Sequence, residues 1–277
     1  MAPVDEYQEV NRASWDERAP AHAASADYAF QRFVDDPTFL SDVVRFDLPL
    51  LGDITGLRGV HLQCHIGTDT ISLARLGARM SGLDFSSAAL VEARRLTELT
   101  GTPIDFVESE VYGAFDVLER ESYDLVFTGI GALCWLPDVR QWARVVADLL
   151  RPGGRLFIRE GHPMLWAMED PRPDGLLVVG FPYVEHEPTV WDEPGTYVET
   201  DVTFTQNRTI SFSHGLGEII SALLEVGMRI TGFVEHDTVP WDALPGMMER
   251  AANGEWRLID RPWRLPHTYT LQAVKST

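Results

Sequence analysis

The stretch GVHLQCHIGTDTISLARLGARMSGLD, residues 59–84, decides the fold. It opens with a short apolar run, turns at Gly67, continues as a helix that Thr68 is expected to cap and Gly77 to end, and closes with a second apolar run. Glycine permits tight turns, and strand–helix–strand units of this kind join two parallel strands through a crossover helix. The stretch therefore predicts an α/β domain.

The same alternation continues toward the C-terminus. Ser86 is expected to cap a helix, PIDFVE (103–108) to form a third strand, and YDLVFTG (123–129) to form a fourth strand that is apolar throughout. Asp138 is expected to begin another helix, which the sequence RPGG stops before RLFIRE (155–160) forms the fifth strand. This repetition predicts a doubly wound, mostly parallel sheet.

The flanking segments complete the expected organisation. Helices are expected at 4–19 and 39–51, and an extended, proline-rich insertion is expected after the fifth strand. One more helix and two strands are expected at 214–226, 228–236 and 267–275. We therefore expect a single domain made of an N-terminal helical lid (1–57), a cofactor-binding core (58–160), the insertion (161–212) and the C-terminal part of the sheet (213–277).

Composition restricts the possible functions. Asp and Glu number 42 against 23 Lys and Arg, which gives a net charge of −19. Nucleic acids and anionic membranes are bound through Lys and Arg, so we expect neither as a partner. No signal-peptide pattern and no run long enough to span a bilayer is present, so we expect a cytoplasmic protein. The two cysteines indicate neither a disulfide framework nor structural zinc.

Polar residues follow the first three predicted strands, where ligands of open α/β sheets bind. Gly67 lets the backbone turn just before a helix N-terminus, and Asp84 could accept hydrogen bonds from both hydroxyls of a ribose. Glu110 could accept from an adenine amino group while the Val111 amide donates to the ring. Each residue also has a plainer role as a turn, cap or solvated loop acid. Because GxGxxG is absent, we expect an adenosine-bearing ligand without phosphates.

These features resemble the class I S-adenosylmethionine-dependent methyltransferases. The Gly67 turn, Asp84, FVESEV (106–111), YDLVFTGIGALCWLPD (123–138) and LLRPGGRLFI (149–158) occur in that family's order and spacing. The resemblance implies a Rossmann-like methyltransferase fold with strand order 3-2-1-4-5-7-6 and an antiparallel seventh strand. It also implies S-adenosylmethionine as cofactor and a small-molecule substrate. The cofactor contacts that it implies come from Gln63, His65, Gly67, Asp84, Phe85, Glu110, Val111, Thr128 and Gly129.

One motif departs from the family pattern. The first motif usually reads acid-hydrophobic-Gly-x-Gly-x-Gly, whereas HLQCHIG places His61 at the acid and replaces two glycines with Gln63 and His65. The usual acid helps to hold the ammonium end of the cofactor. Backbone carbonyls near Gln63 and Gly129, or the side chain of Asp69, are alternative partners for that group. The two larger side chains also narrow the space beside the methionine portion.

Histidines are the candidate bases, because methyl transfer needs alignment and, for some acceptors, removal of a proton. His162, directly after the fifth strand, is the first candidate, with an ordering hydrogen bond in the turn as its alternative role. His22 could arrive with a lid after the N-terminal helix, although a structural role is favoured for it. His214 and His236 are placed on the substrate side, where structural roles are favoured. No histidine pair has metal-ligand spacing, so we expect no metal.

Tryptophans complete the expected acceptor site. Trp15, Trp135, Trp166 and Trp241 lie in segments that lead to one sheet edge, where they could stack on a flat substrate or contact the sulfonium. Core packing is the alternative for about half of them.

We therefore expect methyl transfer to an oxygen, nitrogen or carbon atom of a small, fairly apolar metabolite, with aromatic acceptors included. The N-terminal helix and the insertion are expected to enclose the acceptor. A non-methylating reaction such as cyclisation, a non-catalytic cofactor-binding protein, and a homodimer remain open.

Overall fold

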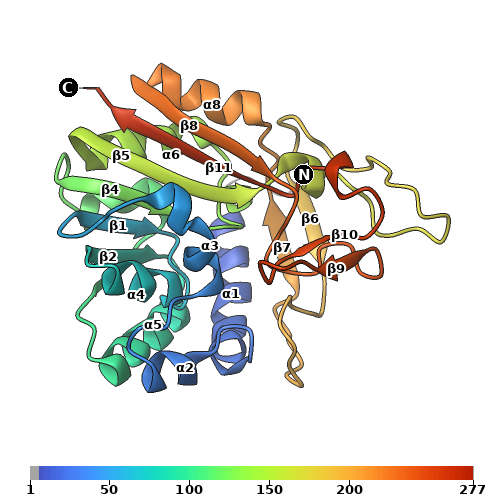
Figure 1. Cartoon of the computed structure of the whole chain (residues 1–277), viewed down its shortest axis with the longest axis horizontal. Helices are drawn as coiled ribbons and strands as arrows, with labels where there is room; N and C mark the ends of the chain where they lie inside the picture. Colours follow the sequence, from blue (N-terminus) through green and yellow to red (C-terminus); the bar gives the residue numbers. More distant parts are fainter. Residues whose placement is uncertain (1–5, 277) are drawn as a thin grey trace.

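A seven-stranded sheet forms the centre of the protein in the computed structural model, which describes residues 6–276 (Figure 1). The strand order is β3-β2-β1-β4-β5-β11-β8. Neighbours among the first five strands pair in parallel, and β11 is antiparallel to both β5 and β8. The expected order, including its antiparallel seventh strand, is confirmed. The strands are β1 (Arg58–Leu62), β2 (Arg79–Asp84), β3 (Asp105–Glu108), β4 (Tyr123–Thr128), β5 (Leu150–Gly161), β8 (Met228–His236) and β11 (Thr268–Lys275).

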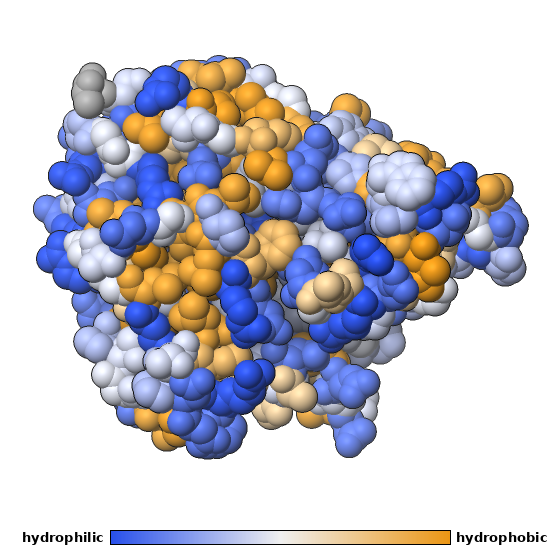
Figure 2. Space-filling view, viewed as in Figure 1, coloured by the Kyte–Doolittle hydropathy of each residue, from blue (hydrophilic) through white to orange (hydrophobic). Residues whose placement is uncertain are grey.

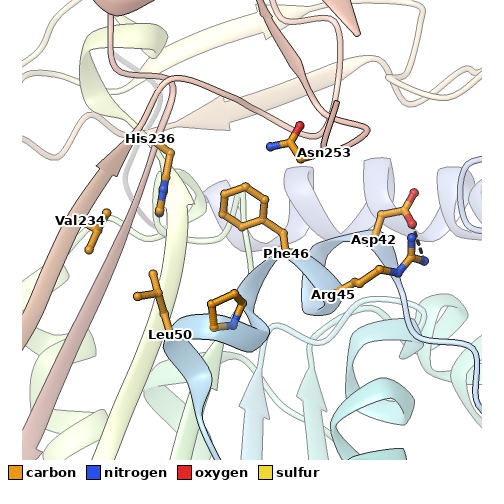
Figure 3. A pocket seen from close by; sticks show the side chains of 8 residues that line it. Asp42, Arg45, Phe46, Leu50, Val234, His236 and Asn253 are labelled. Atoms are coloured by element: carbon orange, nitrogen blue, oxygen red, sulfur yellow. Dashed lines mark ion pairs between the residues drawn. The ribbon is translucent and has the colours of Figure 1, made fainter. Parts of the chain in front are cut away.

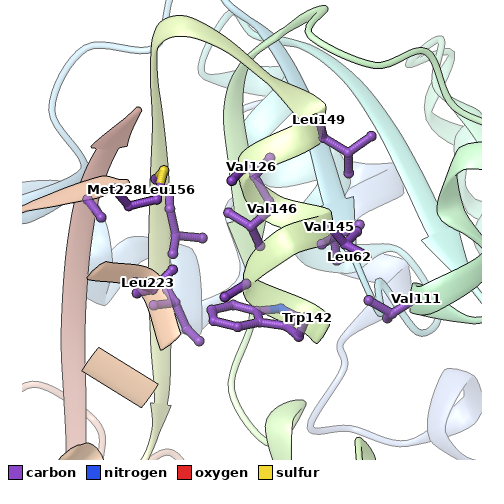
Figure 4. Packing of buried hydrophobic residues seen from close by; sticks show 14 of the residues in the cluster. Leu62, Val111, Val126, Trp142, Val145, Val146, Leu149, Leu156, Leu223 and Met228 are labelled. Atoms are coloured by element: carbon purple, nitrogen blue, oxygen red, sulfur yellow. The ribbon is translucent and has the colours of Figure 1, made fainter. Parts of the chain in front are cut away.

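Helices cover both faces of this sheet. One face carries α6 (Val139–Leu149) and α8 (Leu216–Glu225), and Figure 4 shows Trp142 and Val146 of α6 packed near Val126 and Leu156 of the sheet. Trp142 and Val146 are four residues apart, which places them on the same face of α6, and this face is buried against the sheet. The other face carries α3 (Asp42–Leu51), α4 (Thr68–Arg75) and α5 (Ser87–Thr100).

The N-terminal region is more helical than the sequence predicted. The helix expected at 4–19 is α1 (Tyr7–Ala24), and Val4 lies outside the described residues. The expected end at 19 is wrong, because α1 continues through the exposed Pro20 and buries Ala19 and Ala23 against neighbouring helices. The short helix α2 (Phe30–Asp35) was not predicted.

Two other expected boundaries are corrected. Thr68 is the first residue of α4 and does not cap it, because Gly67 occupies the cap position with φ 79°. The fifth strand begins at Leu150 and includes the RPGG sequence, which was expected to be a loop. Ser86 and Asp138 cap α5 and α6 through their side chains, as predicted.

The insertion forms a lobe beside the carboxyl ends of the strands (Figure 1). It contains α7 (Pro163–Trp166) and an antiparallel hairpin of β6 (Thr189–Asp192) and β7 (Arg208–Ser211). The insertion thus contains a short helix in addition to extended strands. A second unpredicted hairpin, β9 (Met248–Arg250) with β10 (Trp256–Leu258), lies next to it. Figure 2 shows apolar side chains on this lobe among charged ones, and the exposed residues include Leu176, Val179 and Val184.

The N-terminal helix holds this lobe against the sheet. The Asn11 side chain donates to the Ile210 carbonyl and accepts from the Ile210 amide, both at 2.8 Å. Arg18, which is buried, donates to three carbonyls of the insertion, those of Glu193, Gly195 and Gln206. In residues 6–276, no helix combines the length and apolar character needed to cross a membrane.

Candidate active site

The turn after β1 has an unusual backbone. Gln63 and His65 have φ values of 58° and 49°, in the left-handed region that favours glycine, and Gly67 has φ 79°. A side chain at position 67 would also collide, because a β-carbon there would lie 2.9 Å from Ala93 Cβ and from Phe106 Cζ. The turn therefore keeps a glycine-like path although two of its three left-handed residues are not glycine.

Asp84 stands at the end of β2, against this turn. Its Oδ2 accepts from the His65 amide at 2.8 Å and its Oδ1 accepts from the Ser86 amide at 2.9 Å. Burial raises the pKa of Asp84 to about 6, and these backbone hydrogen bonds oppose the rise. Carboxylate oxygens have more than one lone pair, so each can accept a further bond from a ligand hydroxyl.

Glu110 and Val111 follow β3 beside Asp84, since β3 and β2 are neighbours in the sheet. Glu110 Oε2 accepts from the Tyr112 amide at 2.9 Å and so caps the short helix η2 (Val111–Asp116). Val111 is buried below it, and Phe85 is half-buried with the Arg12 guanidinium 5.9 Å from its ring centre. The polar groups expected for an adenosine thus come to one edge of the sheet.

Gly129, which follows β4, lies close to hydrogen-bond acceptor atoms of His61 and Asp69. Thr128 is buried, and a β-carbon built at Gly129 would lie 3.2 Å from His61 Nε2 and 3.7 Å from Asp69 Oδ2. Within the described part of the chain, His61 Nε2 and the buried Gln63 Oε1 have no hydrogen-bond partner. The 3.2 Å distance is a tight contact, so little free volume lies beside these buried acceptors.

The N-terminal helix covers the turn. Trp15 packs edge-to-face on His65 and on Trp135, with ring centroids 5.2 Å and 5.5 Å apart. His22, in the last turn of α1 and not after it as predicted, places its Nδ1 2.9 Å from His65 Nε2. Burial lowers the pKa of His22 to about 4, so its ring is neutral at pH 7.

The insertion meets His22 from the other side. Thr196 Oγ1 lies 2.6 Å from His22 Nε2, and the Tyr197 hydroxyl lies 3.3 Å from His22 Nδ1. Tyr28, between α1 and α2, extends the network through its hydroxyl, which lies 2.5 Å from that of Tyr197. Sequence reasoning missed Tyr28, Thr196 and Tyr197, because they follow no strand of the sheet and belong to no motif.

His162 has both ring nitrogens engaged in the turn after β5. Its Nδ1 accepts from the Met164 amide at 3.0 Å and caps α7, and its Nε2 lies 2.9 Å from Glu235 Oε1. This geometry matches the ordering role that the sequence allowed as an alternative. The role of His162 as a base stays a prediction, and no contact joins His162 to His22 or His65.

The other two candidate histidines, His214 and His236, make structural contacts away from the turn. His214 Nε2 lies 2.7 Å from the Leu136 carbonyl and its Nδ1 3.1 Å from Glu218 Oε2, which ties the start of α8 to the loop after β4. His236 Nε2 lies 2.9 Å from Thr270 Oγ1. Across residues 6–276, no three His, Cys, Asp or Glu side chains come together as metal ligands would.

The four tryptophans form two separate pairs. Trp15 and Trp135 lie over the turn, whereas Trp166 stacks on Trp241 at a centroid distance of 5.5 Å. The short helix α7 directs Trp166 to Trp241 in the C-terminal segment, and which of the four tryptophans contact a substrate stays a prediction.

A cavity of about 520 Å³ lies on a different part of the surface, between α3 and β8. Figure 3 shows Phe46 and Leu50 of α3 facing Val234 and His236 of β8, with Asn253 at its rim. Its lining is largely apolar and includes none of the residues after β1, β2 or β3. This cavity is therefore separate from the turn, where the hydrogen-bonding groups lie.

Part of the chain is similar to known proteins. Residues 60–156 match a family described as a methyltransferase domain. Methyltransferase phqN of Penicillium fellutanum is 25% identical over 68% of this chain and 52% of its own length. A ubiquinone biosynthesis O-methyltransferase of Photorhabdus laumondii is 32% identical over 38% of this chain and 43% of its own. The chain thus spans about half the length of these curated relatives.

Solved structures share the fold at low sequence identity. An S-adenosylmethionine-dependent methyltransferase from Mesorhizobium loti aligns over 82% of this chain and 94% of its own, with a TM-score of 0.57 and 22% identity. The [4+2]-cyclase SpnF aligns over 83% of this chain and 80% of its own, with a TM-score of 0.51 and 14% identity. Residues 60–156 are thus similar to a methyltransferase domain, and the chain shares the fold and strand order of these solved structures.

Proposed function

We propose that this protein transfers the methyl group of S-adenosylmethionine to a small, largely apolar metabolite. The observation that carries the proposal is the position of Asp84, whose buried carboxylate is fixed by two backbone amides at the edge that Trp15 and Trp135 cover. A polar anchor for a ribose thus lies beside an aromatic surface for an acceptor. Flat, ring-containing acceptors suit such a surface because aromatic rings stack or meet edge-to-face.

The residues of the chain would hold the cofactor by its polar ends. Gly67 would let the ligand come close to the backbone, and Asp84 would accept hydrogen bonds from the ribose hydroxyls. Glu110 would accept a hydrogen bond from the adenine amino group, and the Val111 amide would donate one to the ring. The bound cofactor supplies an electrophilic methyl group on a sulfonium. Trp15 and Trp135 exclude water from the acceptor and limit its orientations, which favours an in-line approach.

Proton removal is assigned to His22 ahead of His162. His22 is neutral, lies under the aromatic cover, and is hydrogen-bonded at Nδ1 and Nε2 to groups that can each exchange a proton. His162 uses its nitrogens to cap α7 and to bond Glu235. His22 is therefore the better placed candidate to accept a proton from an acidic acceptor, with Tyr197 and Tyr28 extending the hydrogen-bonded chain.

A second candidate function keeps the cofactor but transfers no methyl group. It is either a non-methylating reaction such as cyclisation or cofactor binding without catalysis, and the side chains of Gln63 and His65, where the resemblance leads one to expect glycines, suggest the latter. Product analysis separates the two candidates. Transfer of labelled methyl from cofactor to product supports the main proposal, whereas product formation without label supports a cyclisation or a similar reaction.

Calorimetry with S-adenosylmethionine and its demethylated product, S-adenosylhomocysteine, tests binding. Asp84→Ala should weaken both by about 1.5–3 kcal/mol, the range for hydrogen bonds to a charged group. An absence of binding heat with either compound would refute the proposal. A labelled-methyl screen of small aromatic and apolar metabolites then tests the acceptor class.

A further inference from the structure

We infer that Glu160, near the end of β5, is a positioning residue that fixes the loop after β4 and, through it, the Trp135 ring that covers the candidate site. The loop comprises residues 129–138 and contains the short helix η3 (Leu133–Trp135). This inference rests on the proposed function and adds a residue to it. Glu160 would act on the acceptor only through Trp135.

The carboxylate of Glu160 accepts hydrogen bonds from four backbone amides. Oε1 accepts from Gly131 and, at 2.7 Å, from Gly161, and Oε2 accepts from Ala132 and Leu133 at 2.8 Å and 2.9 Å. Three of these donors are consecutive residues of the loop. Glu160 is 4% exposed, and in the described part of the chain all of its hydrogen bonds come from backbone amides. One side chain of the sheet therefore holds the start of η3.

The ionised form of Glu160 suits this arrangement. Burial raises the pKa of Glu160, and the four backbone hydrogen bonds oppose that rise. An ionised carboxylate accepts at both oxygens, whereas a protonated one carries a hydrogen on one of them. Removing a charge from water costs free energy, which these neutral amides offset and which an apolar side chain would avoid. The buried carboxylate therefore points to a loop that must keep a defined position.

Gly131 lets the loop turn toward the carboxylate. Its φ is 82°, in the left-handed region, and a β-carbon there would meet no atom within 4 Å. Glycine is thus favoured at this position by the backbone conformation and not by lack of space. An alanine there would strain the loop without touching β5.

The loop joins several parts of the candidate site. Trp135 packs edge-to-face on Trp15 of α1, with ring centroids 5.5 Å apart. The Ala132 carbonyl accepts from Gln63 Nε2 of the turn after β1 at 2.9 Å, and the Cys134 carbonyl accepts at 2.8 Å from the amide of the residue after β7. A displaced loop would therefore move the Trp135 ring against α1 and loosen the alignment of an acceptor beneath it.

Leu133 is a second anchor of the loop, and it differs from Glu160 in kind. Its side chain is buried in the core together with residues of α6. Apolar burial is non-directional, whereas hydrogen bonds have preferred angles. Leu133 can therefore hold the loop on the core, while the four hydrogen bonds to Glu160 set its orientation.

Glu160→Gln removes the charge and keeps the size of the side chain. Glutamine has one acceptor oxygen, so two of the amides would face its NH₂ group. We expect amide hydrogen exchange at residues 131–135, followed by mass spectrometry, to accelerate about tenfold or more. The indole ¹⁵N–H signals of Trp15 and Trp135 should shift or broaden. Glu98→Gln, at an exposed carboxylate of α5, should change neither measurement.

Turnover with a methyl acceptor separates positioning from a purely structural role. Glu160→Gln should lower kcat about tenfold or more when Trp135 is present, and less than about threefold in the Trp135→Ala background, because its effect passes through that ring. A purely structural residue would lower the free energy of unfolding and change kcat by the same factor in both backgrounds.

Gly131→Ala keeps the test decisive if Glu160→Gln does not fold. It displaces the loop from within and should also accelerate exchange and lower kcat. Gly153→Ala is the matched control and should do neither, because Gly153 has φ 80° and equally open surroundings but lies toward the other end of β5.

Two results would overturn the inference and leave the proposed function standing. One is unchanged exchange at residues 131–135 in the folded Glu160→Gln and Gly131→Ala proteins, which would mean that Leu133 alone holds the loop. The other is an equal loss of kcat with and without Trp135. Absence of methyl transfer by the unmodified protein would instead overturn the proposed function and the inference with it.

Discussion

Gln63 combines an unfavourable backbone conformation with a side-chain hydrogen bond that offsets it. A non-glycine residue in the left-handed region costs about 1–2 kcal/mol, and Gln63 Nε2 donates to the Ala132 carbonyl at 2.9 Å. Gln63→Ala loses the hydrogen bond and keeps the unfavourable backbone conformation. Gln63→Gly also loses the hydrogen bond, but glycine adopts this conformation without that cost. The glycine variant should therefore be more stable than the alanine variant by about 1 kcal/mol, even though glycine has greater freedom in the unfolded chain.

Urea unfolding of the two variants measures this difference. Gln141, exposed in α6, provides the matched control, because there glycine should be less stable than alanine by about 1 kcal/mol. The same order of stability at both positions would show that the turn after β1 carries no backbone strain.

Asp47 of α3 should make the stability of the protein depend on pH. It is fully buried, and its Oδ1 lies 3.9 Å from Arg159 Nε. Among residues 6–276, neither of its oxygens has a hydrogen-bond partner. Burial raises the pKa of Asp47 to about 8 from an ordinary value of 3.8. Folding therefore favours the protonated form, so this contribution to stability is fully present below pH 4 and is lost as the pH rises toward 8.

Asp47→Asn mimics the protonated side chain and should remove this dependence. The free energy of unfolding of the unmodified protein, minus that of the variant, should fall between pH 5 and pH 7 by up to about 1.4 kcal/mol per pH unit. Denaturant titrations at these two pH values measure it. A difference that stays constant with pH would mean that Asp47 is ionised throughout.

The residues of the candidate site differ in how far sequence could locate them. Gly67, Asp84 and Glu110 directly follow strands, so strand patterning alone brings them to one edge. Tyr28 and Tyr197 meet there only because the N-terminal helix and the insertion fold onto it, a long-range packing that leaves no local pattern. The hydrogen bond between His162 and Glu235 could not be predicted either, because the two residues are distant in the sequence.

At the scale of elements, one buried arginine joins α1 to the insertion. Arg18 donates to Ser14 within α1 and to the carbonyls of Glu193, Gly195 and Gln206. Arg18→Lys retains the charge but cannot make this set of planar contacts. We expect the variant to fold with an intact sheet and to expose residues 193–206 to protease and to amide hydrogen exchange.

Arg144→Lys, at an exposed arginine of α6, is the control and should behave like the unmodified protein. Hydrogen exchange followed by mass spectrometry resolves the affected segment. Equal exchange at 193–206 in the Arg18→Lys and Arg144→Lys proteins would show that the insertion is held by its other contacts, such as those between Asn11 and Ile210.

Elements were predicted well where periodicity and stop signals agreed and poorly where tertiary packing decided. The apolar spacing and the Asp138 cap located α6, and continuous apolar character located β4. The end of α1 was missed because burial of Ala23 outweighs the cost of Pro20. The strands β9 and β10 have only three residues each, too few to show alternation.

For the molecule as a whole, the sheet explains why distant segments share one function. Parallel strands end at the same edge, so the groups after β1, β2, β3 and β4 gather there, and the resemblance supplied the order of the last two strands. The sheet itself leaves this edge open. The two elements that cover this edge, α1 and the insertion, are far apart in the sequence. They were expected to lie together only because a methyl acceptor must be shielded from water.

Trp15 is the residue through which this cover should act on turnover. It contacts His65 of the turn, Trp135 after β4 and Tyr197 of the insertion, so its removal opens the edge at the junction of all three. Because near-attack alignment contributes strongly to displacement reactions, Trp15→Ala should lower kcat about tenfold or more while the protein stays folded. Trp263→Ala, at a tryptophan that is 79% exposed, should leave kcat unchanged. His162→Ala separates two roles in the same assay, because loss of a helix cap lowers the free energy of unfolding by about 1 kcal/mol, whereas loss of a base lowers kcat. Normal turnover by the Trp15 variant with a genuine acceptor would place the acceptor outside this cover and refute the assignment of this edge.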